Sequence, residues 1–199
     1  MIGRIVHTSV QNGLGTGPGF QPVVQTKSLP SSVVEHAVGE TGYTHPFPPG
    51  DKRNPVVFLH RTAVLGGHSW HFLIRINDAV SDYSGRSNRL SQCVVVDDAG
   101  LAALKDSGTG PCEVLLGFPW EASWPNDRKP FVEEECPPPN SVAQTSGVCK
   151  AWQLATGDAG WAGELALSVG KKQKVVVVAG PEHDTLALFA EALALLPAA

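Results

Sequence analysis

The stretch Trp70-His71-Phe72-Leu73-Ile74-Arg75-Ile76 decides the fold of this 199-residue chain. Bulky apolar residues occupy every second position, which is the period-two pattern of a β-strand with one strongly apolar face. Gly66 and Gly67 mark a turn just before this stretch, and residues 55–61 form a second apolar run ahead of the turn. Two such runs around a glycine turn predict an antiparallel hairpin.

A second hairpin is expected at the N-terminal side. Residues 4–9 and 20–27 read as strands on either side of the loop Gly13-Leu14-Gly15-Thr16-Gly17-Pro18-Gly19. A glycine loop after a strand also suggests nucleotide binding, but that motif requires a helix directly after the last glycine. Here a second strand follows, and no Lys-Ser or Lys-Thr pair comes directly after the last glycine. We therefore favour a turn whose glycines adopt positive φ over a phosphate-binding loop.

The remaining sequence predicts helices and strands that alternate. A helix is expected over residues 31–39, because Ser and Pro precede it and a glycine ends it. Further expected elements are a strand at 93–96, a helix at 99–105, a strand at 113–116, an irregular connection at 117–147, a helix at 150–169, a valine-rich strand at 174–179 and a last helix that begins at Pro181-Glu182-His183-Asp184. We thus expect an α+β fold in a single domain of residues 1–199, with N-terminal antiparallel hairpins and a C-terminal helix–strand–helix unit.

Composition narrows the classes of function. The chain has 15 Lys and Arg against 19 Asp and Glu, a net charge of −4, which argues against a nucleic-acid partner. No apolar run has the length of about 20 residues that a membrane span needs. The N-terminus also lacks the pattern of a signal peptide, so we expect a cytoplasmic location without a membrane partner. The four cysteines form no C-x-x-C pair, and we expect neither a metal nor a cofactor.

Three histidines gather near the central hairpin. His60 lies on its first strand, and His68 and His71 lie around the start of the second. Three imidazoles could bind a catalytic zinc ion. However, positions three apart on a strand point to opposite faces, so we favour ordinary strand and turn histidines.

The polar stretch of residues 81–92 lies between two apolar strands. We expect Arg86 to hold Asp82 in a bidentate pair and Asn88 to stabilise a turn. This structural role is the one we favour. The alternative is a polar site in which Arg86 reads an anionic ligand or the loop of a partner.

The segment Phe118-Pro119-Trp120-Glu121-Ala122-Ser123-Trp124 allows two interpretations. Tryptophan is enriched at interaction hot spots, so the segment could be a recognition loop. It could equally be an apolar cluster that covers the core beneath a long loop. Sequence alone leaves both open.

The order of several motifs resembles that of a known family. These motifs are His7-Thr8-Ser9, Gly13-Leu14, Gly17-Pro18-Gly19-Phe20-Gln21, Leu29-Pro30, Asp82-Tyr83-Ser84-Gly85-Arg86-Ser87-Asn88 and Ala194-Leu195-Leu196-Pro197. The chain is similar in this respect to the N-terminal domain of bacterial GTPase-associated proteins, large proteins encoded beside a GTPase in predicted conflict or signalling systems. The resemblance covers most of the chain, most clearly residues 4–30 and 55–97.

The resemblance implies a non-enzymatic adaptor that binds a GTPase or a sister subunit of a cytoplasmic bacterial assembly. It also implies that the chain could be the N-terminal part of a larger protein. Two alternatives remain: a hydrolase that uses His60 or His71 with Asp82 and a serine, and a purely structural subunit of a larger complex. The expected partner- or ligand-binding residues are Gly17, Pro18, Gly19, Phe20, Asp82, Gly85, Arg86, Asn88, Trp120 and Trp124.

Overall fold

The computed structural model describes residues 1–140, 148–171, 174–180 and 182–196. The chain divides into two compact units, Met1–Asn140 and Ser141–Ala199. The division falls inside the irregular connection that the sequence predicts at 117–147, in a chain that we expected to form one domain. Each unit is described by itself below.

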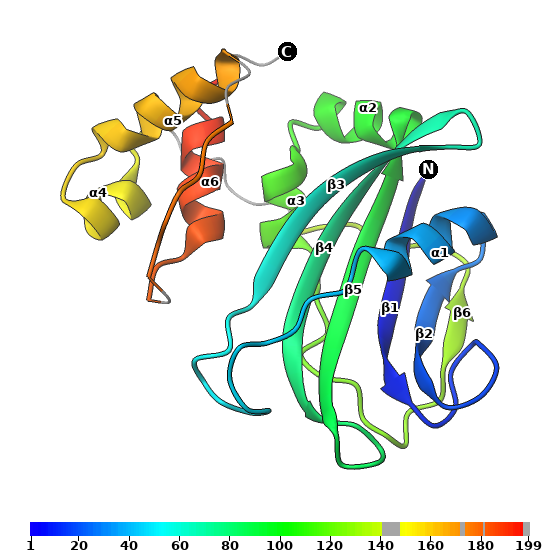
Figure 1. Ribbon diagram of the computed structural model, residues 1–199. Coiled ribbons are helices and arrows are strands. Elements are labelled where there is room, and N and C mark those ends of the chain that lie inside the picture. The colour runs from blue at the N-terminus through cyan, green and yellow to red at the C-terminus, as the bar shows by residue number, and fades with distance from the viewer. Residues whose placement is uncertain (141–147, 172–173, 181, 197–199) are drawn as a thin grey trace. The chain divides into compact units, whose positions relative to one another are not determined.

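A mixed sheet organises the first unit (Figure 1). Both expected hairpins are present, and every neighbouring pair of strands is antiparallel except β2 and β6, which are parallel. The order across the sheet is β3-β4-β5-β1-β2-β6. The strands are β1 (Ile2–Val10), β2 (Gly19–Thr26), β3 (Val57–Leu65), β4 (His68–Ser81), β5 (Ser87–Asp97) and β6 (Phe131–Glu133).

Helix α1 (Ser31–Gly39) covers one face of this sheet (Figure 1). Its buried side chains Val33, Val34 and Ala37 pack on residues from alternate positions of the strands, Phe72 and Ile74 among them. Because successive strand residues point to opposite faces, the alternation from Trp70 to Ile76 places the large apolar residues under the helix. We call this face of the sheet the α1 face.

The opposite face is covered by the chain that follows helix α3 (Pro111–Gly117). Trp124 is buried there against Val24 and Leu90. The side-chain amide of Gln92 donates to the carbonyl of Glu121 and accepts from its N–H, both at 2.8 Å. These contacts fix residues 118–133 as a strap across the sheet. The irregular connection thus begins as an ordered cover that ends in strand β6, and its part at 141–147 lies outside the described residues.

In the sequence, helices α2 (Asp98–Asp106) and α3 (Pro111–Gly117) follow strand β5 and precede the strap. The first matches the expected helix, with Asp97 as the N-cap. The strand that we expected at 113–116 is wrong, because these residues belong to α3. Pro111 begins the helix, and the Glu113 carboxylate accepts a hydrogen bond from the N–H of Gly110 at 3.0 Å. This closure of the first turn favours a helix over a short apolar strand.

The loop within the polar stretch at 81–92 is shorter than the stretch itself. Strand β4 runs to Ser81 and β5 begins at Ser87, so only five residues form the turn. Leu90 and Gln92 are fully buried within β5. Their cross-strand partners on β1 and β4 supply the ladder that a sequence pattern alone does not reveal.

The second unit contains α4 (Lys150–Thr156), α5 (Gly160–Gly170) and α6 (Thr185–Leu193). The single helix expected at 150–169 is two helices, because Gly157 adopts φ +77° and ends α4. Trp152, Leu165 and Leu188 meet in the core of this unit.

The valine-rich strand that we expected at 174–179 is absent. Residues 174–180 have no regular structure, and the side chains of Val176 and Val178 are 75% and 93% exposed. A strand needs a neighbouring strand for its backbone hydrogen bonds, and the described part of this unit offers only helices. Of the expected start of the last helix, Pro181 lies outside the described residues, and Asp184 is the N-cap of α6. The α+β class is confirmed, with N-terminal strands and C-terminal helices.

Candidate functional site

Two loops that are far apart in the sequence meet at one end of the sheet. Strand β1 is antiparallel to both β2 and β5, so the loop between β1 and β2 lies at the same end as the turn between β4 and β5 (Figure 1). We call this region, residues 11–20 and 82–89, the hairpin end. It contains eight of the ten residues that the sequence marks as candidates: Gly17, Pro18, Gly19, Phe20, Asp82, Gly85, Arg86 and Asn88.

Asp82 organises the turn of the hairpin end. Its Oδ1 accepts from the N–H and Oγ of Ser84 at 2.8 and 2.7 Å and from the N–H of Arg86 at 3.0 Å. Its Oδ2 accepts from Ser9 Oγ at 3.0 Å and from the Arg86 guanidinium at 3.2 Å. The Ser84 hydroxyl, followed by the two backbone N–H groups and Ser9, holds the pKa of this carboxyl well below its usual range. Gly85 completes the turn with φ +81°.

Asn88 joins the turn to strand β1. Its Oδ1 accepts hydrogen bonds from the Thr8 hydroxyl at 3.2 Å and from the N–H of Ser9 at 3.1 Å. These bonds bridge about 80 residues of sequence. Asp82 and Asn88 therefore form a rigid base beneath the hairpin end.

Arg86 extends outward from this base. Its side chain is 68% exposed, whereas the side chain of Asp82 is 2% exposed. Nε of Arg86 donates to Ser84 Oγ at 2.8 Å, which orients the guanidinium without enclosing it. An oriented and exposed guanidinium can bind a carboxylate or a phosphate through two parallel hydrogen bonds.

Phe20 is the large apolar side chain of the hairpin end. It is 42% exposed, and its ring lies 4.3 Å from the Arg89 guanidinium carbon. The loop ahead of it contains Gly17 and Gly19, both with positive φ. The Gln21 side chain accepts from the N–H of Gly15 at 3.0 Å and donates to the carbonyl of Gly17 at 2.7 Å. The hydrogen bonds of Gln21 thus hold the glycine loop in the shape of a hairpin connection.

Comparison with known families adds the decisive observation. The sequence model of the family described as GTPase-associated protein 1, N-terminal domain type 2, matches residues 1–142. The chain belongs to this family. The matched region corresponds closely to the first compact unit, Met1–Asn140. No curated protein and no solved structure matches the chain significantly.

The two tryptophan candidates lie on the strap of this GTPase-associated protein domain. Trp124 is 9% exposed and stacks with Phe131 at a centroid distance of 6.4 Å. The Arg128 guanidinium carbon lies 4.3 Å from the Trp124 ring and 5.5 Å from the Phe131 ring. Trp120 is half-buried, and its indole N–H donates to the carbonyl of Leu115 at 2.8 Å. Trp124 is therefore a core residue by its contacts.

The histidines of the central hairpin are remote from the hairpin end. His60 Nε2 and His71 Nδ1 lie 3.0 Å apart, and burial, followed by the neighbouring imidazole, lowers the pKa of His60. His71 is near the start of β4, whereas Asp82 follows its last residue. Ten strand residues span about 30 Å, which is too far for proton transfer. Within the described residues, no three His, Cys, Asp or Glu side chains are grouped to hold a metal ion.

The cysteines of the described chain are poor nucleophiles. All four are free thiols. Burial raises the pKa of Cys112 to about 11 and that of Cys136 to about 12, and it raises the pKa of Cys93 further. A thiol reacts through its thiolate, so none of these three is activated for catalysis.

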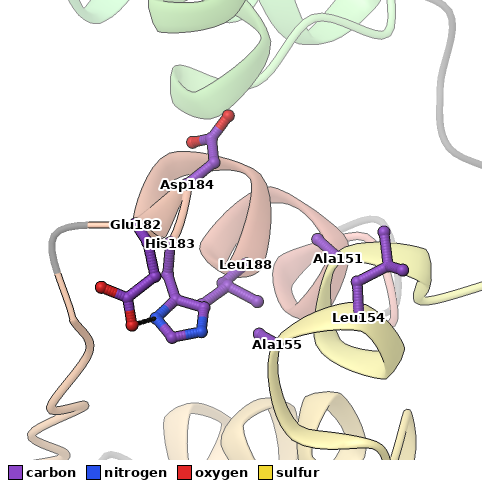
Figure 2. A pocket seen from close by; sticks show the side chains of 7 residues that line it. All are labelled: Ala151, Leu154, Ala155, Glu182, His183, Asp184 and Leu188. Atoms are coloured by element: carbon purple, nitrogen blue, oxygen red, sulfur yellow. Dashed lines mark ion pairs between the residues drawn. The ribbon is translucent and has the colours of Figure 1, made fainter.

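The second unit contains a pocket that sequence reasoning missed (Figure 2). It has a volume of about 390 Å³, and His183 Nδ1 lies 3.3 Å from Glu182 Oε1 at its rim. The polar run before α6 was the only sequence signal for it. Its lining residues are Ala151, Leu154, Ala155, Glu182, His183, Asp184 and Leu188. None of them falls in the region that the family model matches.

No helix in the ranges that the structure describes is both long enough and apolar enough to cross a membrane.

Proposed function

We propose that this chain is a non-enzymatic interaction module that binds a GTPase, or a sister subunit of the same bacterial assembly, through its hairpin end. The name of its family associates that family with a GTPase. The observation that supports the hairpin end is the pairing of an exposed Phe20 and an exposed Arg86 on a base fixed by Asp82 and Asn88. Rigid loops with an aromatic and an arginine are typical of interaction hot spots.

Arg86 would supply the electrostatic part of the contact. A GTPase presents phosphate oxygens and the acidic residues around its magnesium ion, and a guanidinium can pair with either. In the sharpest form of the proposal, Arg86 acts as an arginine finger supplied in trans, which stabilises the charge that develops on the transferred phosphoryl group. We place this module in a cytoplasmic conflict or signalling system.

Two competing functions have weaker support. A hydrolase that combines Asp82 with His60 or His71 would need groups that β4 holds about 30 Å apart. The Asp82 carboxylate also accepts hydrogen bonds from Ser9, Ser84 and Arg86, so its oxygens are poorly placed to accept a proton from a substrate. A purely structural subunit would not require an oriented guanidinium at an exposed turn.

Co-purification from the source cell tests the proposal, with GDP or a non-hydrolysable GTP analogue added and the bound proteins identified by mass spectrometry. We expect a stoichiometric GTPase or sister subunit with the unaltered chain, and its loss with Phe20→Ala or Arg86→Ala. Matched controls are Val64→Ala and Arg61→Ala, which change exposed residues on β3. Retention of the partner by Phe20→Ala and Arg86→Ala, or its loss with the controls, would contradict the proposal.

A further inference from the structure

Three neighbouring side chains under Phe20 contain polar atoms without a partner. The Oγ of Ser91, the Nε of Arg89 and both ring nitrogens of His7 are buried without a hydrogen bond of ordinary geometry, and the backbone of Phe20 makes only a weak contact with the His7 ring, which raises its pKa less than burial lowers it. His7 is 3% exposed and Ser91 is 1% exposed. Polar groups buried without hydrogen-bond partners are rare and energetically costly, so three such side chains in one place indicate a binding site for a polar ligand.

The strand register brings these groups together. His7 on β1 is paired with Ser91 on β5, so the two side chains are neighbours on one face. Arg89 lies two residues before Ser91 on that same face. Phe20 is paired with Ser9, two residues beyond His7, and its ring lies 5.6 Å from the His7 ring. The cluster occupies the α1 face beyond the end that α1 covers (Figure 1).

The cluster carries the positive charge of the Arg89 guanidinium. Among the residues that the structure describes, no carboxylate pairs with the Arg89 guanidinium. Asp78, its neighbour on β4, accepts instead from the N–H of Gly50 and from the Asn54 amide. Burial lowers the pKa of Arg89, and burial followed by the Arg89 charge lowers the pKa of His7 to about 4. The Phe20 ring is what covers the guanidinium, through a cation–π contact.

We infer that Arg89, Ser91 and His7 form an oxyanion-binding site that Phe20 covers. The guanidinium, the hydroxyl and one imidazole N–H are donors, and a phosphate or carboxylate group would supply the acceptors that all three lack. Phe20 is 42% exposed, so a change of its side-chain rotamer, with the paired backbone of β2 in place, would uncover the three donors. Entry of the anion replaces the cation–π contact with a charged hydrogen bond.

The test uses the isolated chain without any partner, so its result does not depend on the proposed GTPase contact. Sodium phosphate and sodium acetate are titrated separately at constant ionic strength, with sodium chloride as the reference salt. NMR follows the Arg89 Nε–H and the His7 ring. We expect saturable binding of at least one anion with a Kd of about 1–10 mM, and a His7 pKa that rises above its value of about 4 when the anion is bound. Phosphate binding alone identifies a phosphate site, and acetate binding alone identifies a carboxylate site.

Variants separate this site from the rest of the hairpin end. Arg89→Gln should weaken anion binding at least about tenfold, and Arg89→Lys, which keeps the charge but loses the planar fork, should weaken it at least about threefold. If Arg89→Gln does not fold, Arg89→Lys decides the question. Phe20→Ala should bind the anion as tightly as the unaltered chain or more tightly, although it should lose the partner. Arg61→Ala, which changes an exposed arginine on β3, should leave anion binding unchanged.

Shifts that fail to saturate, or an equal Kd in the folded Arg89 variants, would overturn the inference and leave the partner proposal standing. Retention of the partner by Phe20→Ala and Arg86→Ala, together with saturable anion binding that depends on Arg89, would do the reverse.

Discussion

Replacement of Trp124 by alanine tests which of the two interpretations of the tryptophan segment is correct. Trp124 is 9% exposed and packs on Val24 and Leu90 beneath the strap. A buried tryptophan removes about 200 Å² from water, which corresponds to about 5 kcal/mol as an upper value. Measured Trp→Ala changes in cores are about 3–5 kcal/mol. Loss of the Arg128 contact, at 4.3 Å, adds up to about 1 kcal/mol.

We therefore expect Trp124→Ala to lower the free energy of unfolding by about 4 kcal/mol, and the Tm by about 10 °C. Chemical and thermal unfolding should be followed by far-UV circular dichroism, because the substitution itself removes a fluorophore. Trp161→Ala is the matched control: Trp161 is 55% exposed on α5. Its loss should cost less than about 1 kcal/mol.

The reasoning is refuted if Trp124→Ala unfolds within about 1 kcal/mol of the unaltered chain. That result, together with loss of a partner, would mean that the segment is a recognition loop rather than a cover for the sheet.

Three further predictions concern buried charges. Glu133→Ala should cost about 3 kcal/mol, because it removes the 2.7 Å bond from the buried Arg4 guanidinium to Glu133 Oε2 and leaves the Glu121 carboxylate, 3.9 Å away, as the remaining ion-pair partner in the described part of the chain. In urea unfolding the double variant Arg4→Met/Glu133→Leu should be more stable than Glu133→Ala, and an equally unstable double variant would count against this. The pKa of His7 is about 4 in the folded chain and about 6.5 in the unfolded chain, so the unfolded chain takes up a proton first as the pH falls. The free energy of unfolding should therefore fall by about 3 kcal/mol as the pH drops from 6.5 to 4. His7→Asn should abolish this part of the pH profile, and an unchanged profile would reject the assignment. Glu191→Ala should destabilise the second unit by about 2 kcal/mol in thermal unfolding, because the Glu191 carboxylate accepts hydrogen bonds from the N–H groups of Ala151 and Trp152 at the start of α4. The control is Glu182→Ala, which removes an exposed carboxylate and should change the stability little.

Much of the sheet could be predicted from local pattern. The alternation from Trp70 to Ile76 indicates which face of the strand is buried, and such a pattern can be read from each strand without knowledge of its neighbours. The errors lie where a local pattern fits two structures or where the outcome depends on distant contacts. The short apolar run after Glu113 fits a strand or a helix equally, and the first-turn hydrogen bond to Gly110 decides for the helix. The valine run has strand propensity but no neighbouring strand in the described unit.

The candidate site was predictable in its residues but not in its architecture. Asp82, Arg86 and Asn88 stand out as residue types in a polar turn. The expected pair of Asp82 with Arg86 is present, but Nε and one terminal nitrogen of Arg86 both donate to Oδ2, at 3.3 and 3.2 Å, so the pair is not the expected bidentate one. The bonds of Asn88 to Thr8 and Ser9 cross about 80 residues, so no local pattern could reveal them. The cluster of His7, Ser91 and Arg89 likewise depends on strand register, which the sequence does not state.

The central claim is that the hairpin end binds the partner, and one affinity comparison tests it most directly. The co-purified GTPase or sister subunit, in the nucleotide state that retains it, should be titrated calorimetrically with the unaltered chain, with Phe20→Ala/Arg86→Ala, and with the control Arg61→Ala/Val64→Ala. The account predicts that the Kd rises at least about 100-fold for the hairpin-end pair, since each such anchor contributes about 1–2 kcal/mol or more, and that it stays within about threefold for the control. An unchanged Kd for the folded hairpin-end pair would contradict the account and place the partner surface elsewhere on the chain.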